Sequence, residues 1–422
     1  MATILEEDAV IIGAGIAGLA TAVALKRLGI RALVLEKADG LRATGAALTL
    51  FPNAWLALDA LGVSHKLTSI YPRTKRGLIT NIRTGATQEI SFVTTTGRIE
   101  SGPRSVHRRT LLEALADELP INTIHFSAKV SAIETETLEG SSIAVIHLGD
   151  GTIIKAKILI GCDGVHSTVA RWLGLSAPVD SGRSSVRGMA VFPEGHGLNQ
   201  EVRQFVDAGI RAGFIPLNDK EIYWFLNYKC LPKGENTSAN PELIQKELLE
   251  NYAEIMPPLY LDVVRHCDLS TLTRAPLMFR YPWDIMFGNL SKGNITVAGD
   301  AMHPMTPDLA QGGCSALEDA VVLGRHIGNS LIKHNALVSG GISEAVDGYV
   351  KERRWRITWL VAGAYLSGWV QQGGSKWWMK FLRDVVFYKL LFSRIVNTIQ
   401  YDCGKLPRIP FAGEFDNSNK ID

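Results

Sequence analysis

Cysteine is scarce in this chain, and its arrangement excludes two kinds of site. The 422 residues include five cysteines, an odd number, and no two of them form a CxxC pair. This pattern disfavours both a disulfide framework and a zinc site built on paired cysteines. A reducing compartment is the plain interpretation, so we predict a cytoplasmic protein. The cysteines are Cys162, Cys230, Cys267, Cys314 and Cys403.

Long apolar runs and an excess of one charge are also missing. No stretch reaches the roughly 18 consecutive apolar residues of a membrane-spanning helix, and the nearest, Ile357 to Val370, predicts a buried helix. The formal charge of +2 indicates no charge-driven nucleic-acid partner. Met1 to Asp8 is acidic and leads directly into an apolar run, so neither a signal peptide nor a transit sequence is expected.

One segment departs from this even charge. Residues 376–396 are amphipathic and carry five Lys or Arg residues against one Asp. This pattern is compatible with a helix on a membrane surface, but a helix packed on its own protein with a solvated basic face is more common. We favour the packed helix and keep membrane association as the alternative.

Glycine, in contrast, is concentrated in three motifs, and the first has the setting of a nucleotide-binding turn. Gly13-Ala14-Gly15-Ile16-Ala17-Gly18 lies between the apolar run Ala9–Ile12 and a helix predicted over Gly15–Leu28. Arg31–Glu36 follows as a second strand, which completes a βαβ unit. Glu36 comes 23 residues after Gly13, close to the spacing of about 20 for an acid that binds a ribose.

The residue types in this motif suit the contacts that a dinucleotide needs. Gly13 permits a tight turn, Gly15 lets the backbone approach a pyrophosphate, and Gly18 lets helix and strand pack closely. The helix N-terminus offers free N–H groups to the phosphates. Glu36 should bind a ribose diol and repel a 2'-phosphate. We assign to this site Gly13, Gly15, Ala17, Gly18, Glu36 and Lys37.

The other two motifs indicate FAD rather than NAD. They are Gly161-Cys162-Asp163-Gly164 and Gly299-Asp300-Ala301-Met302-His303-Pro304. Asp300 ends a strand, where it can bind a ribitol hydroxyl, and Pro307 stiffens the following loop. Gln311-Gly312-Gly313 then opens a helix, whose N–H groups suit the negative edge of a reduced flavin. One such motif would be a weak signal, but three in this order are hard to dismiss.

Apolar patterns outside the motifs predict further elements. Helices are expected over Arg108–Leu119 and Gly313–Ile327. Strands are expected over Lys129–Ile133, Ser142–Leu148, Lys157–Ile160, Arg203–Val206, Ala212–Leu217, Ile222–Lys229 and Ile295–Ala298.

The order of these elements indicates several lobes, since single cores stop growing at roughly 250 to 300 residues. We predict an α/β protein with a discontinuous Rossmann-like FAD-binding domain, a mixed β-sheet substrate domain and a helical C-terminal segment. The FAD-binding domain takes residues 1–73, 102–181 and 288–360. The substrate domain takes 74–101 and 182–287, and the C-terminal segment takes 361–422.

With these motifs in view, the chain resembles the group A FAD-dependent monooxygenases of the para-hydroxybenzoate hydroxylase-like superfamily. Within it, the plant branch near zeaxanthin epoxidase and the salicylate hydroxylase-like enzymes is most similar. Gly299 to Pro307, with Gln311-Gly312-Gly313 and Glu318-Asp319-Ala320, resembles the ribitol and flavin loop of the family. Ile160 to Ser167 resembles its DG motif, which in the family serves both FAD and NAD(P)H.

The resemblance implies further cofactor-binding residues. Arg108 falls where the family places an arginine on the flavin nucleotide, with a surface arginine at a helix start as the alternative. Arg42, ahead of Thr44-Gly45-Ala46-Ala47, is a weaker match. The residues implied in this way are Arg42, Ala47, Arg108, Asp163, Gly164, Asp300, Pro307, Gly312 and Gly313.

The family also implies a reaction. NAD(P)H reduces bound FAD, O2 adds at flavin C4a, and the hydroperoxide passes one oxygen to a small, largely apolar, aromatic or olefinic substrate. Water destroys a hydroperoxide, so the sheet above the flavin must exclude solvent. Apolar residues of the predicted strands fit such a roof, with one face of each strand toward the pocket: Phe214, Ile215, Pro216, Tyr223, Trp224 and Phe225.

Substrate contacts are implied at two positions. Some aromatic hydroxylases of the superfamily hold a phenolate with an arginine and a tyrosine of the sheet, and Arg187 and Tyr223 are the nearest candidates here. The alternative is that Arg187 pairs with a surface acid and Tyr223 packs within the sheet. His303 and His107 are interpreted as structural histidines rather than catalytic bases.

Several points stay open from the residues alone. Hydroxylating a phenol benefits from a nearby base, whereas epoxidation needs none; we favour hydroxylation. A flavin dehydrogenase or reductase on the same fold is one alternative, and a flavin-binding protein without turnover is another. No metal is expected, and a monomer and a homodimer are both compatible with the sequence.

Overall fold

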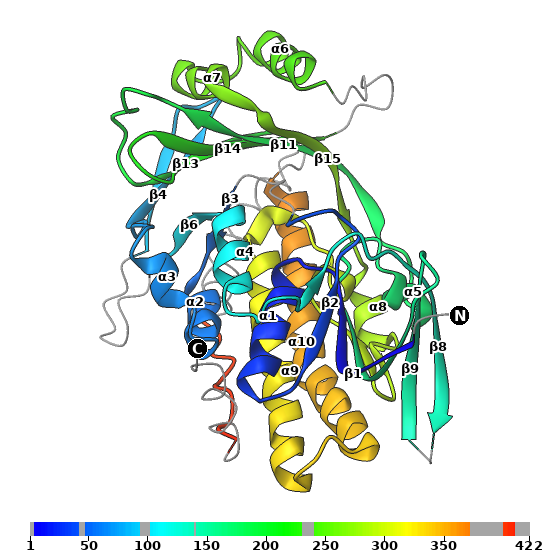
Figure 1. The fold of residues 1–422 in the computed structure, drawn as a ribbon. Helices are drawn as coiled ribbons and strands as arrows, with labels where there is room; N and C mark the ends of the chain where they lie inside the picture. The colour runs from blue at the N-terminus through cyan, green and yellow to red at the C-terminus, as the bar shows by residue number, and fades with distance from the viewer. Residues whose placement is uncertain are drawn as a thin grey trace.

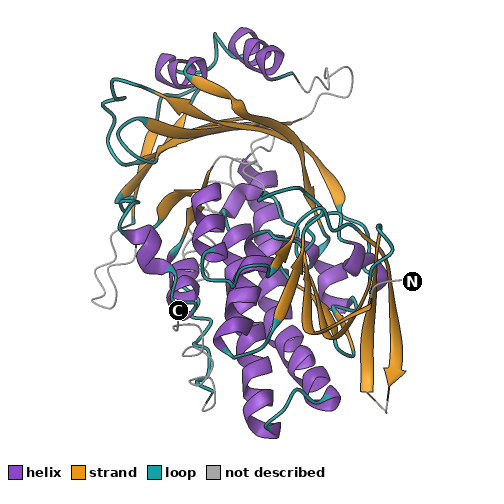
Figure 2. Ribbon diagram, viewed as in Figure 1, coloured by secondary structure: helices purple, strands orange, loops and turns teal. Residues whose placement is uncertain are grey.

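A computed structural model describes residues 4–41, 47–92, 102–138, 141–229, 240–371 and 400–409. Two sheets dominate the fold, and helices lie between and beside them (Figure 1). Figure 2 shows a curved sheet at the top with two helices on its outer side, and a helix-rich body below it that carries the second sheet.

The lower sheet is built around β1 (Ile4–Ile12), whose residues Ala9 to Ile11 are fully buried. β1 pairs in parallel with β10 (Ile153–Gly161) on one side and β2 (Ala32–Leu35) on the other. A parallel strand covered on both faces needs apolar side chains throughout, which explains the short apolar run in the sequence. The central order is β16-β17-β10-β1-β2-β7, and the other strands are β16 (Ser291–Lys292), β17 (Ile295–Val297), β7 (Ile124–His125), β8 (Val130–Leu138) and β9 (Ser141–Leu148).

Three helices form the centre of the body. α1 (Ile16–Arg27) packs on α9 (Gly312–His334), and α9 packs on α10 (Ser339–Gln371). Small residues permit the first contact, because a Cβ on Gly324 would lie 2.9 Å from the Cβ of Ala24. The shorter helices of the body are α2 (Pro52–Ala60), α3 (Ser64–Thr68), α4 (Arg108–Ala116), α5 (Thr168–Trp172) and α8 (Pro282–Phe287), with the 3-10 turns η1 (Gly299–Ala301) and η2 (Pro307–Leu309).

The upper sheet is the roof sheet, and its described strands run in the order β15-β11-β14-β13-β12-β4-β5. It is mixed, because β4 pairs in parallel with β12 whereas the other pairs are antiparallel. α6 (Pro241–Asn251) and α7 (Pro258–Arg265) lie on its outer side (Figure 1). The strands are β4 (Arg76–Asn81), β5 (Thr87–Ser91), β11 (Val179–Val191), β12 (Val202–Asp207), β13 (Ile210–Pro216), β14 (Glu221–Lys229) and β15 (Cys267–Phe279). A separate pair, β3 (Ala47–Leu50) and β6 (Arg104–His107), completes the strands.

Side chains of the roof sheet alternate between its two faces as a pleated strand requires. Phe214 and Trp224 are buried on the outer face, where Trp224 meets Tyr260 of α7 edge to face. Tyr223 and Phe225 point the other way and line a cavity. The roof sheet therefore has a core on one side and a site on the other.

The predicted strands and helices are present, with different bounds in several places. β1 begins at Ile4 because its first residues pair with β10. α6 and α7 lack a counterpart among the predicted elements. The proposed boundary at 360/361 falls inside α10, and β4 and β5 lie in the same sheet as the strands after residue 179. The domain bounds as a whole stay a prediction, and the basic segment 376–396 lies outside the described residues.

Among the helices of the described ranges, none has the length and apolarity that crossing a membrane would require.

Candidate active site

The first glycine motif forms a tight turn between β1 and α1. Gly13 has a φ of +102°, and a Cβ there would lie 2.5 Å from the carbonyl oxygen of Cys162. A Cβ on Gly18 would lie 1.9 Å from the carbonyl oxygen of Gly13. Around Gly15, in contrast, an added Cβ would meet no other described residue within 4 Å. Gly13 and Gly18 thus serve the fold, whereas Gly15 leaves open space for a ligand.

Glu36 stands beside this turn at the end of β2. Its carboxylate is buried and accepts the Ala14 N–H at 2.8 Å and the Ala38 N–H at 2.9 Å. These two bonds fix an acidic group next to the glycines. Lys37 is exposed.

The second motif follows β10. Asp163 accepts the Thr168 N–H at 2.6 Å through Oδ2, at the start of α5. Its other oxygen, Oδ1, is buried and has no hydrogen-bond partner among the residues that the structure describes. Gly164 has a φ of +80° and lines the cavity. The turn therefore holds a carboxylate with unused acceptor capacity close to open space.

The third motif turns from β17 into α9. Asp300 is exposed to the cavity from η1, and Pro307 lines it from η2. Ala310 has a left-handed φ of +51°, which reverses the chain so that Gly312 and Gly313 reach the cavity wall at the start of α9. Free N–H groups at a helix start favour a negative charge there.

A buried ion network beneath this loop was missed by the sequence reasoning. Asp319 accepts the Gly299 N–H at 2.9 Å and His303 Nε2 at 2.6 Å. Arg353 donates to Asp319 at 2.7 Å and to Glu318 at 2.6 Å. Burial alone would raise the pKa of Asp319, but His303 and Arg353 hold this pKa well below its ordinary value. His303 therefore has the structural contact that its interpretation predicted.

The three motifs and the roof sheet enclose one cavity of about 410 Å³. Cofactor-side candidates and both roof candidates line it together. From the assigned set these are Gly15, Ala17, Ala47, Arg108, Gly164, Asp300, Pro307, Gly312, Gly313, Arg187 and Tyr223. Gly13, Gly18, Glu36, Lys37 and Asp163 are not part of this lining, and Arg42 lies outside the described residues.

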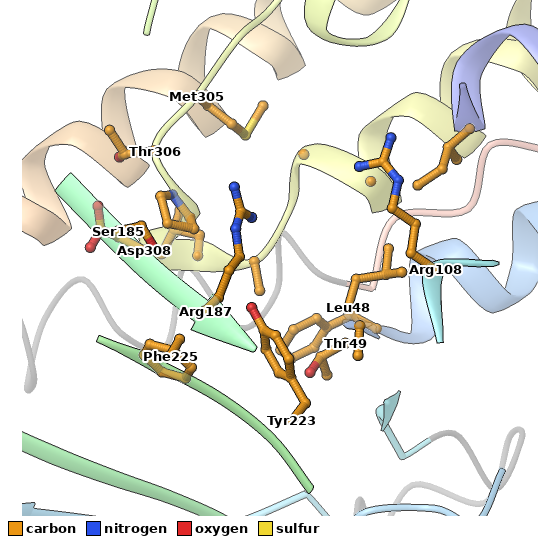
Figure 3. A pocket seen from close by; sticks show the side chains of 18 of the residues that line it. Leu48, Thr49, Arg108, Ser185, Arg187, Tyr223, Phe225, Met305, Thr306 and Asp308 are labelled. Atoms are coloured by element: carbon orange, nitrogen blue, oxygen red, sulfur yellow. The ribbon is translucent and has the colours of Figure 1, made fainter. Parts of the chain in front are cut away.

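Arg187 and Tyr223 enter the cavity from neighbouring strands of the roof sheet. In the β11–β14 ladder, Arg187 is opposite Phe225 and Met189 is opposite Tyr223, so Arg187 and Tyr223 are diagonal neighbours on one face. Figure 3 shows both side chains in the same space, with Arg108 on another side of it. Burial raises the pKa of Tyr223 and nearby Arg187 only partly offsets this, so the phenol stays protonated at neutral pH. Within the described chain Arg187 has no ion pair with an acid, unlike the surface alternative.

An arginine cluster at the cavity wall was also missed. Asp308 of η2 has a fully buried side chain and receives Arg183 at 2.8 Å and Arg211 at 3.3 Å. Arg183 comes from β11 and Arg211 from β13, so the cluster joins the roof sheet to the loop after the third motif. Gln204 accepts from Arg211 at 3.1 Å. Pro307-Asp308 looks like an ordinary turn in the sequence, and no local pattern signals these partners.

This arrangement fits a flavin dinucleotide. Open space above Gly15, a fixed acid at Glu36, spare acceptor capacity at Asp163 and a helix start at Gly312 match the donors and acceptors of such a cofactor. The fold and cavity define a two-lobed flavin-dependent oxidoreductase.

The family model described as "FAD binding domain" matches residues 6–363, and, together with the two monooxygenases below, it shows that the chain belongs to the FAD-dependent monooxygenases. Monooxygenase 2 of Arabidopsis thaliana is 42% identical over 409 residues, which cover 94% of this chain and 98% of that protein. Monooxygenase 1 of Arabidopsis thaliana is 38% identical over 410 residues, which cover 95% of this chain and 100% of that protein.

A solved structure extends the comparison. Klebsiella pneumoniae HpxO complexed with FAD and uric acid superposes with a TM-score of 0.79 at 25% identity, covering 94% of this chain and 98% of that one. The predicted family, the α/β fold class and the FAD cofactor are confirmed. The protein is an FAD-dependent monooxygenase, and NAD(P)H is the reductant typical of its family.

Proposed function

We propose that this monooxygenase uses NAD(P)H and O2 to hydroxylate a small, largely apolar aromatic metabolite. The observation that supports it is the cavity in which Arg187 and Tyr223 of the roof sheet face the three nucleotide turns. Epoxidation of an olefinic metabolite is the second form of the same proposal. Bound FAD supplies the redox chemistry and the activation of O2.

The cofactor is proposed to lie along the three turns. Gly13, Gly15 and Gly18 form the pyrophosphate turn, and Glu36 takes the ribose. Asp300 takes the ribitol chain, and the α9 N-terminus faces the negative edge of the flavin ring. Further contacts are assigned to Ala17, Lys37, Arg42, Ala47, Arg108, Asp163, Gly164, Pro307, Gly312 and Gly313.

The roof sheet is proposed to hold the substrate and keep water out. Ile215, Val202 and Phe225 present apolar surface to the cavity. Arg187 carries a positive charge without a carboxylate partner in the described chain, and Tyr223 offers a protonated hydroxyl beside it. These two groups suit a substrate with an anionic or strongly polarised oxygen, such as a phenolate.

A relative supports this substrate class. The FAD-dependent urate hydroxylase of Klebsiella pneumoniae is 29% identical over 319 residues, which cover 75% of this chain and 80% of that protein. Urate is small, planar and acidic, which are the properties that Arg187 and Tyr223 would recognise. An aromatic ring with an acidic oxygen is therefore the proposed substrate class.

Hydroxylation is favoured because a phenolate oxygen held near Arg187 would activate the aromatic ring that carries it. A base for removing its proton would have to come from the cavity wall. Among the described lining residues the carboxylates are Asp300 and Asp308, and Asp308 is already paired with two arginines. Asp300 is assigned to the cofactor, so neither lining carboxylate is available as a base, and the proposal takes the substrate to bind beside Arg187 already ionised as a phenolate.

The test is substrate-gated reduction of the flavin. A panel of phenols, hydroxyheterocycles and olefins is mixed anaerobically with the yellow holoprotein and NADH or NADPH, and flavin bleaching is followed by the loss of its visible absorbance. Acidic aromatic compounds should accelerate bleaching, and Arg187→Met should remove that acceleration while FAD binding stays intact. Tyr223→Phe serves as the conservative partner variant. Equal acceleration by neutral olefins in both variants would contradict the phenol assignment.

Two other functions have discriminating outcomes. A flavin reductase would oxidise NAD(P)H without forming an oxygenated product. A flavin-binding protein without turnover would show negligible NAD(P)H oxidation with every compound. The cytoplasmic location, the choice between monomer and homodimer, and membrane association through residues 376–396 stay predictions.

A further inference from the structure

The guanidinium of Arg353 lies at the centre of the buried network beneath the loop of residues 299–313, here called the flavin loop. We propose that Arg353 is a positioning residue: it holds the two ends of the flavin loop in place and contributes positive charge that favours the reduced flavin. This inference rests on the proposed placement of FAD against that loop.

Arg353 reaches three partners at once. It is fully buried on α10 and donates from Nε to Asp319 at 2.7 Å, from Nη1 to Glu318 at 2.6 Å and from Nη2 to the Ser315 hydroxyl at 2.8 Å. All three partners lie in the first turns of α9. A planar, forked side chain is suited to such simultaneous contacts, whereas a lysine is a single point charge.

Glu318 and Asp319, which Arg353 holds in place, are connected by hydrogen bonds to opposite ends of the flavin loop. Asp319 accepts from the Gly299 N–H at 2.9 Å, which fixes the first end. Glu318 accepts from Asn53 Nδ2 at 2.6 Å, and the same amide donates to Gln311 at 2.9 Å, which fixes the second end. Arg353 is thus one hydrogen bond away from Asp319, which holds the first end, and two hydrogen bonds away from Asn53, which holds the second.

Charge balance gives Arg353 a second effect. The side chains of Glu318 and Asp319 are both 0% exposed, so each needs a compensating cation. Arg356 contacts Glu318 at 2.5 Å, whereas within the described part of the chain the side chains paired with Asp319 are those of His303 and Arg353. Removing Arg353 would leave uncompensated negative charge beneath the loop that faces the flavin. A reduced flavin, which is itself negative at its N1 edge, would then be disfavoured.

The experiment compares Arg353→Met and Arg353→Lys with Arg354→Met. Arg354 is the adjacent residue on α10 and donates to the carbonyls of Ile285, Met286 and Gly288, away from the flavin loop. It is therefore a matched control for loss of a structural arginine. The readouts are the FAD dissociation constant, from flavin fluorescence, and the midpoint potential of the bound flavin, from anaerobic dye equilibration.

In Arg353→Met the FAD dissociation constant should rise at least tenfold. The preference for reduced over oxidised flavin should fall at least tenfold, which lowers the two-electron midpoint potential by about 30 mV. Arg353→Lys should restore most of the potential but not the affinity, because it returns the charge without the fork. Arg354→Met should lower the melting temperature yet leave both flavin readouts within about twofold.

Unchanged affinity and potential in Arg353→Met, or equal shifts in Arg354→Met, would overturn the inference. Should Arg353→Met fail to fold, Arg353→Lys and Asn53→Ala decide. Asn53→Ala keeps every charge but removes the hydrogen bond to Gln311, so it should weaken FAD binding while the midpoint potential stays unchanged. Wild-type FAD affinity in both Arg353→Lys and Asn53→Ala would refute the positioning role. Asp300→Ala distinguishes a failure of this inference from a failure of the proposed FAD placement. If Asp300→Ala too binds FAD with wild-type affinity, the proposed placement of the flavin is wrong.

Discussion

Replacing Gly15 by alanine separates cofactor binding from folding more cleanly than any other change in the first motif. The residue has φ −81° and ψ −173°, a conformation that alanine adopts without strain, and apart from its chain neighbours no atom of the described residues lies within 4 Å of the added Cβ. The methyl group would therefore fit the protein but occupy the space proposed for the pyrophosphate.

Gly15→Ala should raise the stability of the apoprotein and lower its affinity for FAD. Gly→Ala at a compatible position stabilises a fold by about 0.4–1 kcal/mol through the unfolded chain. A methyl group forced into a packed ligand contact costs about 1–3 kcal/mol, which corresponds to a roughly 5- to 150-fold weaker FAD affinity. The apoprotein should melt no earlier than wild type, whereas the holoprotein should lose its FAD on dilution.

Thermal unfolding of the apoprotein and fluorescence titration with FAD measure the two quantities. Gly18→Ala is the contrasting variant, because its Cβ would lie 1.9 Å from the carbonyl oxygen of Gly13. It should destabilise the apoprotein itself. Wild-type FAD affinity in a folded Gly15→Ala protein would refute the pyrophosphate assignment.

Three further predictions concern the arginine cluster, the buried acids and the roof. A Cβ on Gly368 would lie 2.4 Å from Asp308 Oδ2, so Gly368→Ala should lower the melting temperature and raise the substrate KM while FAD affinity is kept; an unchanged KM would contradict the role of the cluster. The folded pKa of Asp319 is lowered, so its stabilising effect is complete above its unfolded pKa of about 3.9 and is lost as pH falls from there through the folded pKa. Urea denaturation should therefore show stability falling below roughly pH 4. A flat profile down to pH 2 or so would refute this. Trp224→Ala should cost about 3–5 kcal/mol of stability at an unchanged KM, whereas Phe225→Ala should change the KM more than the stability; the reverse result would mean that the two faces are wrongly assigned.

The turn proposed to bind the cofactor could be predicted from the sequence because it depends on local backbone requirements. Gly13 needs a left-handed φ and Gly18 a close approach, and Glu36 ends a strand at a fixed distance along the chain. Each requirement acts within one βαβ unit, so spacing alone carried it. In β14, in contrast, Tyr223, Trp224 and Phe225 are consecutive aromatic residues, so the sequence did not indicate which of them face the cavity; the structure places Tyr223 and Phe225 there.

The missed residues depend on contacts between distant segments. Asp308 belongs to the arginine cluster only through its bonds to Arg183 and Arg211, which are 125 and 97 residues away along the chain. Arg353 meets Asp319 across 34 residues and from a different helix. Neither relation follows a helical or strand period, so no pattern along the chain could find it.

The helices outside the roof sheet left a fainter signal that could have been used. Asn240 accepts the Glu242 N–H at 2.9 Å, and Pro241 occupies the first turn of α6. An Asn followed by Pro is a typical helix start.

Isotope incorporation tests the central claim most directly. Holoprotein is supplied with NAD(P)H, an accelerating acidic aromatic compound and ¹⁸O2, and the product is analysed by mass spectrometry. The account predicts one labelled oxygen atom in the product for each NAD(P)H oxidised, with little free H2O2. Stoichiometric H2O2 and an unlabelled aromatic compound, found for every compound that speeds flavin reduction, would contradict it.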